Sequence, residues 1–317
     1  MLTIDPTQLK VAVLAGGTSG EREISIASGA GACTALREAG FNPETLDPAR
    51  KDDLKALLDG SFDVAFLCLH GKGGEDGVIQ GFLECAGVPY TGSGVLASAV
   101  AMDKSKSKPF YRAAGLDVPD SVTVHRGEVD DIRAACDAVG FPCVVKPACE
   151  GSALGVFVVR EREEYEGAIA RAFEVADVLV VERYVTGVEV TAAVIGNEDL
   201  VALPVIEIVP FHEFYDFESK YAPGGSKHIC PARLSIEQAE RVKRDAIRAH
   251  CALGCSGVSR TDFIVDRAGV PWVLETNTIP GMTSASLLPD AARAAGMDFS
   301  TLCTRLIELA LEKGQID

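Results

Sequence analysis

The chain has 317 residues, of which 47% are hydrophobic and 24% are charged. This length allows two or three domains with their own cores, and the composition is that of an ordinary globular protein. With 30 Lys and Arg residues against 46 Asp and Glu residues, the net charge is -16, which disfavours nucleic acid and anionic membranes as partners. Any bound phosphate must therefore be held by a few locally placed cations.

Two features of the sequence predict a cytoplasmic protein. No apolar run approaches the ~18 residues of a membrane span, and residues 1–6 lack the basic start and apolar core of a signal peptide. The ten cysteines are scattered without the spacing of a zinc site. We therefore expect free thiols in a reducing compartment.

The N-terminal part alternates strand and helix patterns. Residues 11–15 and 63–69 are apolar strands, and a helix is expected at 21–39 between them. Such a pattern is typical of a parallel sheet that is covered on both faces. Ligands bind these sheets at the loops that follow the strands, which here are residues 16–21 and 70–77.

The remaining chain is expected to fold as short strands around a few helices, which is the α+β pattern. We place the domain divisions so that residues 1–92 form an N-terminal α/β domain, 93–181 a central domain and 182–317 a C-terminal domain. The expected elements are helices at 104–114 and 299–312 and strands at 143–146, 156–159, 178–185, 188–195 and 200–208.

Residues 211–231 have no clear period and carry several aromatic side chains. A polar stretch of this length in a compact domain is usually either disordered or a functional lid. We predict a lid, because Phe214, Tyr215 and Phe217 precede Lys220 and Tyr221 within it.

A predicted β-hairpin carries the strongest chemical signal of the chain. With Ala268-Gly269 as a two-residue turn, Asp262 lies directly opposite Glu275, with their Cβ atoms roughly 5 Å apart. Glu275 and Asn277 share one strand face because side chains alternate. Two carboxylates and an amide are hard oxygen ligands of the kind that Mg²⁺ binds together with water and phosphate. The alternative is a solvated hairpin edge.

Two other segments are suited to a nucleotide. The loop from Lys146 to Gly155 is rich in glycine, and consecutive backbone N–H groups in such a turn can bind an anion; an ordinary hairpin with a solvated lysine is the alternative. The apolar strand at 178–185 could bind an adenine edge through its backbone, with Glu182 or Glu189 near the ribose. These two carboxylates could equally be exposed charges at a strand end.

The sequence resembles the D-alanine:D-alanine ligases of the ATP-grasp superfamily over nearly its whole length. The stretches that carry the resemblance are Ala15 to Ser25, Leu69 to Gly77, Tyr90 to Gly94, Met102 to Lys104, Glu150 to Ser152, Phe214 to Asp216 with Lys220 and Tyr221, and Glu275 to Thr283. The resemblance implies a three-domain ATP-grasp fold. It also implies an ATP-dependent ligase that makes D-alanyl-D-alanine for peptidoglycan precursors through an acyl phosphate.

The resemblance further implies roles for individual residues. Nucleotide binding would fall to Lys104, Lys146, Glu182, Arg183, Tyr184, Val185, Glu189 and Lys220. Two Mg²⁺ ions, for which Mn²⁺ could substitute, would be held by Asp262, Glu275 and Asn277. D-Alanine would be bound by Glu21, His70, Ser286 and Leu287, and the catalytic residues would be Glu21, Ser152, Tyr221, Arg260 and Gly281. Besides D-alanine, the expected partner is a second copy of the chain in a homodimer.

Two residues have a further interpretation. Glu21 could serve helix formation, since Thr18-x-x-Glu21 has the spacing of a capping box. Ala153 stands where the family often has a serine, so slightly weaker ATP binding is expected.

Three other functions fit parts of the sequence. The first is a ligase that makes D-alanine:D-lactate or D-alanine:D-serine. Tyr221 argues against it, because a tyrosine at this position resembles the dipeptide-forming ligases. The second is a dinucleotide-dependent oxidoreductase, which would need a Gly-x-Gly-x-x-Gly spacing after the first strand that the chain lacks. The third is a non-catalytic nucleotide-binding regulator.

Overall fold

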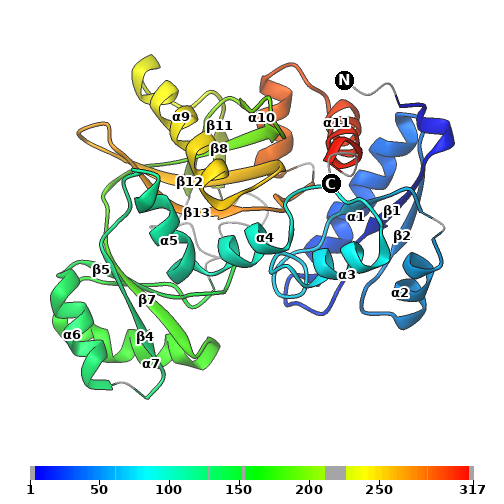
Figure 1. Cartoon of the computed structure of the whole chain (residues 1–317). Helices are drawn as coiled ribbons and strands as arrows, with labels where there is room; N and C mark the ends of the chain where they lie inside the picture. Colours follow the sequence, from blue (N-terminus) through cyan, green and yellow to red (C-terminus); the bar gives the residue numbers. More distant parts are fainter. Residues whose placement is uncertain are drawn as a thin grey trace.

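The protein is described from a computed structural model, which covers residues 4–60, 62–127, 129–151, 154–210, 226–283 and 285–313. It contains three sheets with helices packed on them (Figure 1). The mixed α/β and α+β class predicted from the sequence is confirmed. Within the described ranges, every helix is too short or too polar to span a bilayer.

The N-terminal sheet is parallel, as predicted, with strand order β2-β1-β3. Its elements are β1 (Lys10–Leu14), α1 (Arg22–Glu38), β2 (Asn42–Leu46), α2 (Lys51–Leu58), β3 (Val64–Leu67) and α3 (Val78–Ala86). The last helix of the chain, α11 (Phe299–Lys313), returns to pack against α1 (Figure 1). The loops after β1 and β3 lie at one edge of this sheet, because parallel strands end at the same edge.

The central sheet has strand order β4-β7-β5-β6 and is antiparallel. Its elements are β4 (Ser121–His125), α6 (Val129–Val139), β5 (Cys143–Pro147), β6 (Phe157–Val159), α7 (Tyr165–Val175) and β7 (Val178–Arg183). Cys143 and Val145 join the core that α6 and α7 cover. Because strand side chains alternate, Val144 and Lys146 point to the opposite face, where they line a cavity.

The C-terminal sheet has strand order β11-β10-β8-β12-β13, with β9 paired to β8. Its strands are β8 (Gly187–Gly196), β9 (Val201–Ala202), β10 (Ile206–Pro210), β11 (Ser226–Ile229), β12 (Gly257–Asp266) and β13 (Pro271–Asn277). The single strand predicted at 200–208 is wrong. It is divided around Pro204, whose nitrogen has no hydrogen to donate to a ladder.

Both faces of the C-terminal sheet are covered. The helices are α4 (Val95–Met102), α5 (Lys104–Ala113), α9 (Ile236–Leu253) and α10 (Leu287–Ala294). Residues of α4, α5 and α9 share a core with Val190, Ala192 and Val194, whereas α10 and α11 share a core with Ala193 and Ile195. The division at 92/93 and 181/182 stays a prediction; α4 and α5 contact α9 and β13.

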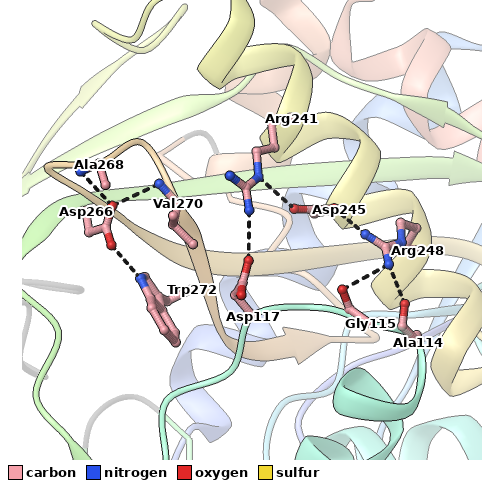
Figure 2. Close-up of polar contacts among 10 residues, drawn as sticks. All are labelled: Ala114, Gly115, Asp117, Arg241, Asp245, Arg248, Asp266, Ala268, Val270 and Trp272. Atoms are coloured by element: carbon pink, nitrogen blue, oxygen red, sulfur yellow. Dashed lines mark hydrogen bonds and ion pairs between the residues drawn. The ribbon is translucent and has the colours of Figure 1, made fainter.

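The hairpin β12–β13 pairs Asp262 with Glu275 as predicted, but the predicted two-residue turn is wrong. Val265 pairs with Pro271, and the turn between Asp266 and Val270 contains three residues. An irregularity in the ladder between residues 262 and 263 leaves Leu274 as an extra residue, and this β-bulge restores the pairing of the two carboxylates. At the tip, the Asp266 carboxylate accepts hydrogen bonds from the Ala268 and Val270 amides and from Trp272 Nε1, each at 2.9 Å (Figure 2).

Helix α9 fixes the chain segment that follows α5. Arg241 donates to Asp117 Oδ2 at 2.8 Å, and Arg248 donates to the carbonyl groups of Ala114 and Gly115 (Figure 2). The Asp117 carbonyl in turn accepts from the Val273 amide at 2.8 Å. The C-terminal end of α5 is therefore held between α9 and the hairpin, and this positions the helix that begins at Lys104.

We predict that Leu302→Ala destabilises the N-terminal and C-terminal parts together. Leu302 is fully buried in the core that α11 shares with the N-terminal sheet. Truncating a buried leucine lowers the free energy of unfolding by about 2–5 kcal/mol. Thermal unfolding followed by far-UV circular dichroism measures the effect, with Ile236→Ala as the control because Ile236 is 86% exposed. Equal melting temperatures for the two variants would contradict the prediction.

Candidate functional site

Two cavities lie next to each other and share a wall. The first has a volume of about 410 Å³ and is lined by the loops after β1 and β3 and by the chain after β13. The second has a volume of about 460 Å³ and lies between the central sheet and the C-terminal sheet. Lys104, Glu150, Gly151 and Glu275 line both cavities, and we call these four residues the shared wall.

The predicted site residues are divided between the two cavities. Those in the first cavity are Glu21, His70, Arg260, Asn277, Gly281, Ser286 and Leu287. Those in the second cavity are Lys146, Glu182, Arg183, Tyr184, Val185, Glu189 and Asp262. Lys104 and Glu275 belong to both. Ser152, Ala153, Lys220 and Tyr221 lie outside the described residues, as does most of the predicted lid at 211–231.

The shared wall is held by an ion pair between buried Lys104 and half-buried Glu275. Lys104 Nζ lies 3.0 Å from Glu275 Oε2 and donates a hydrogen bond to the Glu150 carbonyl at 2.8 Å. Burial lowers the pKa of Lys104, but attraction by Glu275 outweighs burial, so the pKa is raised above its ordinary value. Lys104 is therefore a permanent cation at the point where the cavities meet.

Asp262 is contacted by a cation and by two neutral donors. Arg260 Nε lies 3.1 Å from Asp262 Oδ1, and Thr191 Oγ1 donates to the same oxygen at 2.5 Å. Asn277 Nδ2 lies 3.5 Å from Asp262 Oδ2. Among the described residues, no group of three or more His, Cys, Asp or Glu side chains could hold a metal ion. The predicted ligand set contains only two carboxylates and is completed by an amide.

The predicted ligands fit Mg²⁺ by the chemistry of their donors. Asp262, Glu275 and Asn277 offer hard oxygen atoms, and the first two face each other across the hairpin. Arg260 and Lys104 now contact these carboxylates, so a metal ion would compete with them for the same oxygens.

A second buried carboxylate, that of Glu182, lies in the second cavity between two lysines. Lys146 Nζ lies 2.5 Å from Glu182 Oε1, and Lys108 Nζ lies 2.7 Å from Oε2. Burial raises the pKa of Glu182, but Lys108 and Lys146 lower it by more, so the pKa is held below its ordinary value. Glu182 is therefore ionised at neutral pH.

The end of β7 presents both backbone and side-chain groups to the second cavity. The Arg183 amide donates to the Asp120 carbonyl at 2.8 Å, so this N–H group is already paired within the protein. The Arg183 guanidinium lies 4.5 Å from the centre of the Trp272 ring, which joins β7 to the hairpin.

Glu21 lies where the N-terminal loops meet the loop after β5. A Cβ atom added to Gly71 would lie 2.7 Å from Glu21 Oε2, and one added to Gly151 would lie 3.3 Å from it, so both glycines admit the carboxylate. The predicted capping box with Thr18 is wrong. Glu21 is itself the N-cap of α1 and its side chain caps nothing, whereas its amide donates to Ser19 Oγ at 3.2 Å.

His70 and Glu75 complete the buried side of the first cavity. His70 Nε2 lies 3.3 Å from Ser28 Oγ, and burial lowers the pKa of His70, so the imidazole is neutral near pH 7. Glu75 accepts a hydrogen bond from the Gly71 amide at 2.7 Å, and burial raises the pKa of Glu75 to about 8.

The sequence did not single out Glu75, Glu150 or Lys108. Glu75 lies in the loop 70–77, which was predicted to bind a ligand without any role for this residue. Glu150 contributes its carbonyl, which no residue type reveals. Lys108 had a usable signal, because it follows Lys104 by four residues in a predicted helix and so shares its face.

The fold and the two cavities define the ATP-grasp class, in which a nucleotide site lies between two antiparallel sheets. The family model described as "D-ala D-ala ligase C-terminus" matches residues 110–308, and the one described as "D-ala D-ala ligase N-terminus" matches residues 43–93. A D-alanine--D-alanine ligase from Syntrophobacter fumaroxidans is 48% identical over 307 residues, which are 96% of this chain and 98% of the relative.

Solved structures agree with these matches. A Bacillus anthracis D-alanine--D-alanine ligase complexed with ATP has a TM-score of 0.83 and 34% identity, covering 98% of this chain and 99% of that one. The VanG D-Ala:D-Ser ligase from Enterococcus faecalis has a TM-score of 0.82 and 32% identity, covering 95% and 99%. The chain belongs to the D-alanine–D-alanine ligase family.

We predict that Glu75→Gln makes stability less dependent on pH. The pKa of Glu75 is about 8 in the folded protein and near 4.5 when unfolded, so its proton favours the folded state. This contribution is complete below the unfolded pKa and is lost as the pH rises through the folded pKa. Between pH 5 and pH 8 the melting temperature should therefore fall less in Glu75→Gln than in the wild type. Glu198→Gln, in an exposed turn, is the control; identical profiles for all three proteins would refute the assignment.

Proposed function

We propose that the protein is an ATP-dependent ligase that joins two D-alanine molecules into D-alanyl-D-alanine for peptidoglycan precursor synthesis. Membership of the D-alanine–D-alanine ligase family supports the reaction. The observation that carries the proposal within this chain is the shared wall, because a nucleotide in one cavity and an amino acid in the other would meet there. Family membership also argues against the other two functions considered, a dinucleotide-dependent oxidoreductase and a non-catalytic regulator.

ATP is assigned to the second cavity, with its phosphates toward the shared wall. Lys146 and Lys104 are buried cations that would neutralise the phosphates, and Lys220 would add a third. Glu182, Arg183, Tyr184, Val185 and Glu189 would hold the adenosine.

Two D-alanine molecules are assigned to the first cavity, whose volume of about 410 Å³ suits small ligands. Glu21 would bind the ammonium group of the first D-alanine, with His70 nearby. Ser286 and Leu287 would bind the second D-alanine. Ser286 Oγ accepts from the Thr283 amide at 3.0 Å, and a Cβ on Gly281 would lie 2.8 Å from this oxygen, so the turn is built around a glycine.

Two Mg²⁺ ions would be held by Asp262, Glu275 and Asn277. When bound, the metal would neutralise charge on the phosphates of ATP. Mn²⁺ is the expected substitute.

The chain's own residues would promote two successive reactions. First, a carboxylate oxygen of one D-alanine attacks the γ-phosphorus of ATP, so that an acyl phosphate and ADP form. Lys104 and Lys146 neutralise the phosphates during this transfer. Then the neutral amine of the second D-alanine attacks the acyl carbon and the C–N bond forms. Phosphate leaves with the bonding electrons of the C–O bond, and the nitrogen loses one proton to the departing phosphate. Arg260 and the Gly281 amide would stabilise the oxyanion between these events.

The proposal also covers the acceptor, two further catalytic residues and a lid. We propose D-alanine as the acceptor, with Ser152 and Tyr221 as catalytic residues and the segment 211–231 as a lid that excludes water. The likeness to a D-Ala:D-Ser ligase makes D-serine the first alternative acceptor to test. A homodimer and a cytoplasmic location are part of the same proposal.

Phosphate release tests the function directly. With ATP and Mg²⁺, D-alanine alone should stimulate release by orders of magnitude over the rate without amino acid, and chromatography should show D-alanyl-D-alanine in equal amount. L-Alanine should not stimulate. D-Serine or D-lactate, each added with D-alanine, should yield little mixed product. Phosphate release that does not depend on D-alanine would reject the proposal, and a dominant mixed product would change the acceptor.

We predict that Glu275→Gln raises the Mg²⁺ concentration needed for half-maximal activity and lowers turnover by orders of magnitude. The amide retains a hydrogen-bond acceptor for Lys104 but removes one negative charge from the ligand set. Steady-state rates across a Mg²⁺ titration measure the effect. Glu240→Gln on the exposed side of α9 is the matched control. A folded Glu275→Gln enzyme with normal turnover and normal Mg²⁺ dependence would show that Glu275 is no ligand.

A further inference from the structure

Helix α5 places a lysine with no assigned role directly behind the nucleotide cavity. Lys108 is 1% exposed and lies 2.7 Å from Glu182, whose other carboxylate oxygen meets Lys146. Glu182 and Lys146 line the second cavity, whereas Lys108 is not among its lining residues. The three side chains thus form a buried row, with Glu182 between the two lysines and Lys108 behind the residues that line the cavity.

The charges in this row do not balance. Lys108 and Lys146 carry two positive charges, and Glu182 carries one negative charge. Burial lowers the pKa of Lys108, and attraction by Glu182 limits that fall. Unbalanced buried charge is unfavourable, so the row is poised to accept a further anion. Of the two lysines in the row, only Lys146 lines the cavity.

We propose that Lys108 is a positioning residue for ATP, which holds Glu182 so that the Lys146 ammonium is available to the phosphates. The inference rests on the proposed placement of ATP in the second cavity. When a phosphate draws Lys146 away, Lys108 still neutralises Glu182, and no buried carboxylate is left without a cation. Without Lys108, Lys146 and Glu182 would form a neutral pair, and ATP would have to break that pair in order to bind.

The position of Lys108 is fixed by its helix. Asp103 caps the first turn of α5 by accepting from the Ser105 amide at 2.9 Å, and Tyr111 donates to Thr276 at 2.8 Å on the hairpin strand β13. Lys104, Lys108 and Tyr111 lie on one face of the helix, because residues spaced by four and then three positions do so. The helix therefore positions the shared wall and the buried row as one unit.

The test compares ATP with adenosine, because adenosine has no phosphates for Lys146 to bind. Lys108→Met keeps most of the side-chain volume and removes the charge. Calorimetric titration should give ATP affinity weakened by about tenfold or more, which is the loss expected for a hydrogen bond to a charged group. Adenosine affinity, measured by competition, should change less than about twofold. In steady-state assays KM for ATP should rise while kcat changes little.

A double variant separates charge balance from packing. In Lys108→Met/Glu182→Gln the buried anion is removed as well, so Lys146 is released again, and ATP affinity should return to within about threefold of that of Glu182→Gln alone. Lys108→Gln serves as a second single variant in case the Met variant does not fold. It can hydrogen-bond Glu182 but cannot neutralise it, so it should also weaken ATP binding selectively.

The outcomes decide between the inference and its alternatives. Equal losses for ATP and adenosine, or no recovery in the double variant, would make Lys108 a structural residue and overturn the proposal. Unchanged ATP affinity in either folded single variant would overturn it too. The titrations contain no D-alanine. If the wild type failed to bind ATP, the proposed function would fall as well; if it binds ATP and the variants bind as tightly, only the role of Lys108 fails.

Discussion

The ion pair between Lys104 and Glu275 is the contact on which the site depends. It joins the first residue of α5 to the hairpin β12–β13 at 3.0 Å, and both residues line both cavities. The tip of the hairpin is fixed by hydrogen bonds to Asp266, and the segment that follows α5 is fixed by α9, so both elements that carry the ion pair are anchored elsewhere. Because the same residues line both cavities, groups bound in the two cavities can meet at the shared wall.

Because the chain has a net charge of -16, binding of a polyanion such as ATP would depend on a few lysine and arginine side chains gathered at the site. Each buried cation near the wall is held by a carboxylate, with Lys104 on Glu275, Arg260 on Asp262 and Lys146 on Glu182. Such pairs contribute little net stability, because desolvation offsets most of the attraction. They do keep the cations in place before the substrate arrives. Binding of ATP and metal would then exchange partners within a prearranged set of charges.

Most of the residues predicted for the site line the two cavities, and the sequence signals that named them are local. The pairing of Asp262 with Glu275 was predicted from the position of the turn. The turn was predicted one residue too short, and the bulge at Leu274 compensated for it. The capping box at Thr18 failed because Glu21, not Thr18, is the N-cap of α1, and the Glu21 amide donates to Ser19 Oγ. The strand at 200–208 failed at Pro204. Motif resemblance supplied the roles that spacing alone left open.

What the sequence did not reveal depends on long-range packing. Glu75 and Lys108 are ordinary charged residues until the fold buries them, and only then do their pKa values shift. Likewise, the contact of α11 with α1 joins the two ends of the chain, which no local pattern indicates.

ATP and D-alanine are proposed to meet at the shared wall. A crystal structure of the complex with a non-hydrolysable ATP analogue, Mg²⁺ and D-alanine would show whether they do. We expect the α and β phosphates at Lys146 and Lys104, and the γ-phosphate at the shared wall, in contact with the carboxylate of a D-alanine whose ammonium group lies at Glu21. A nucleotide whose phosphates point away from this wall, or a D-alanine bound outside the first cavity, would contradict it.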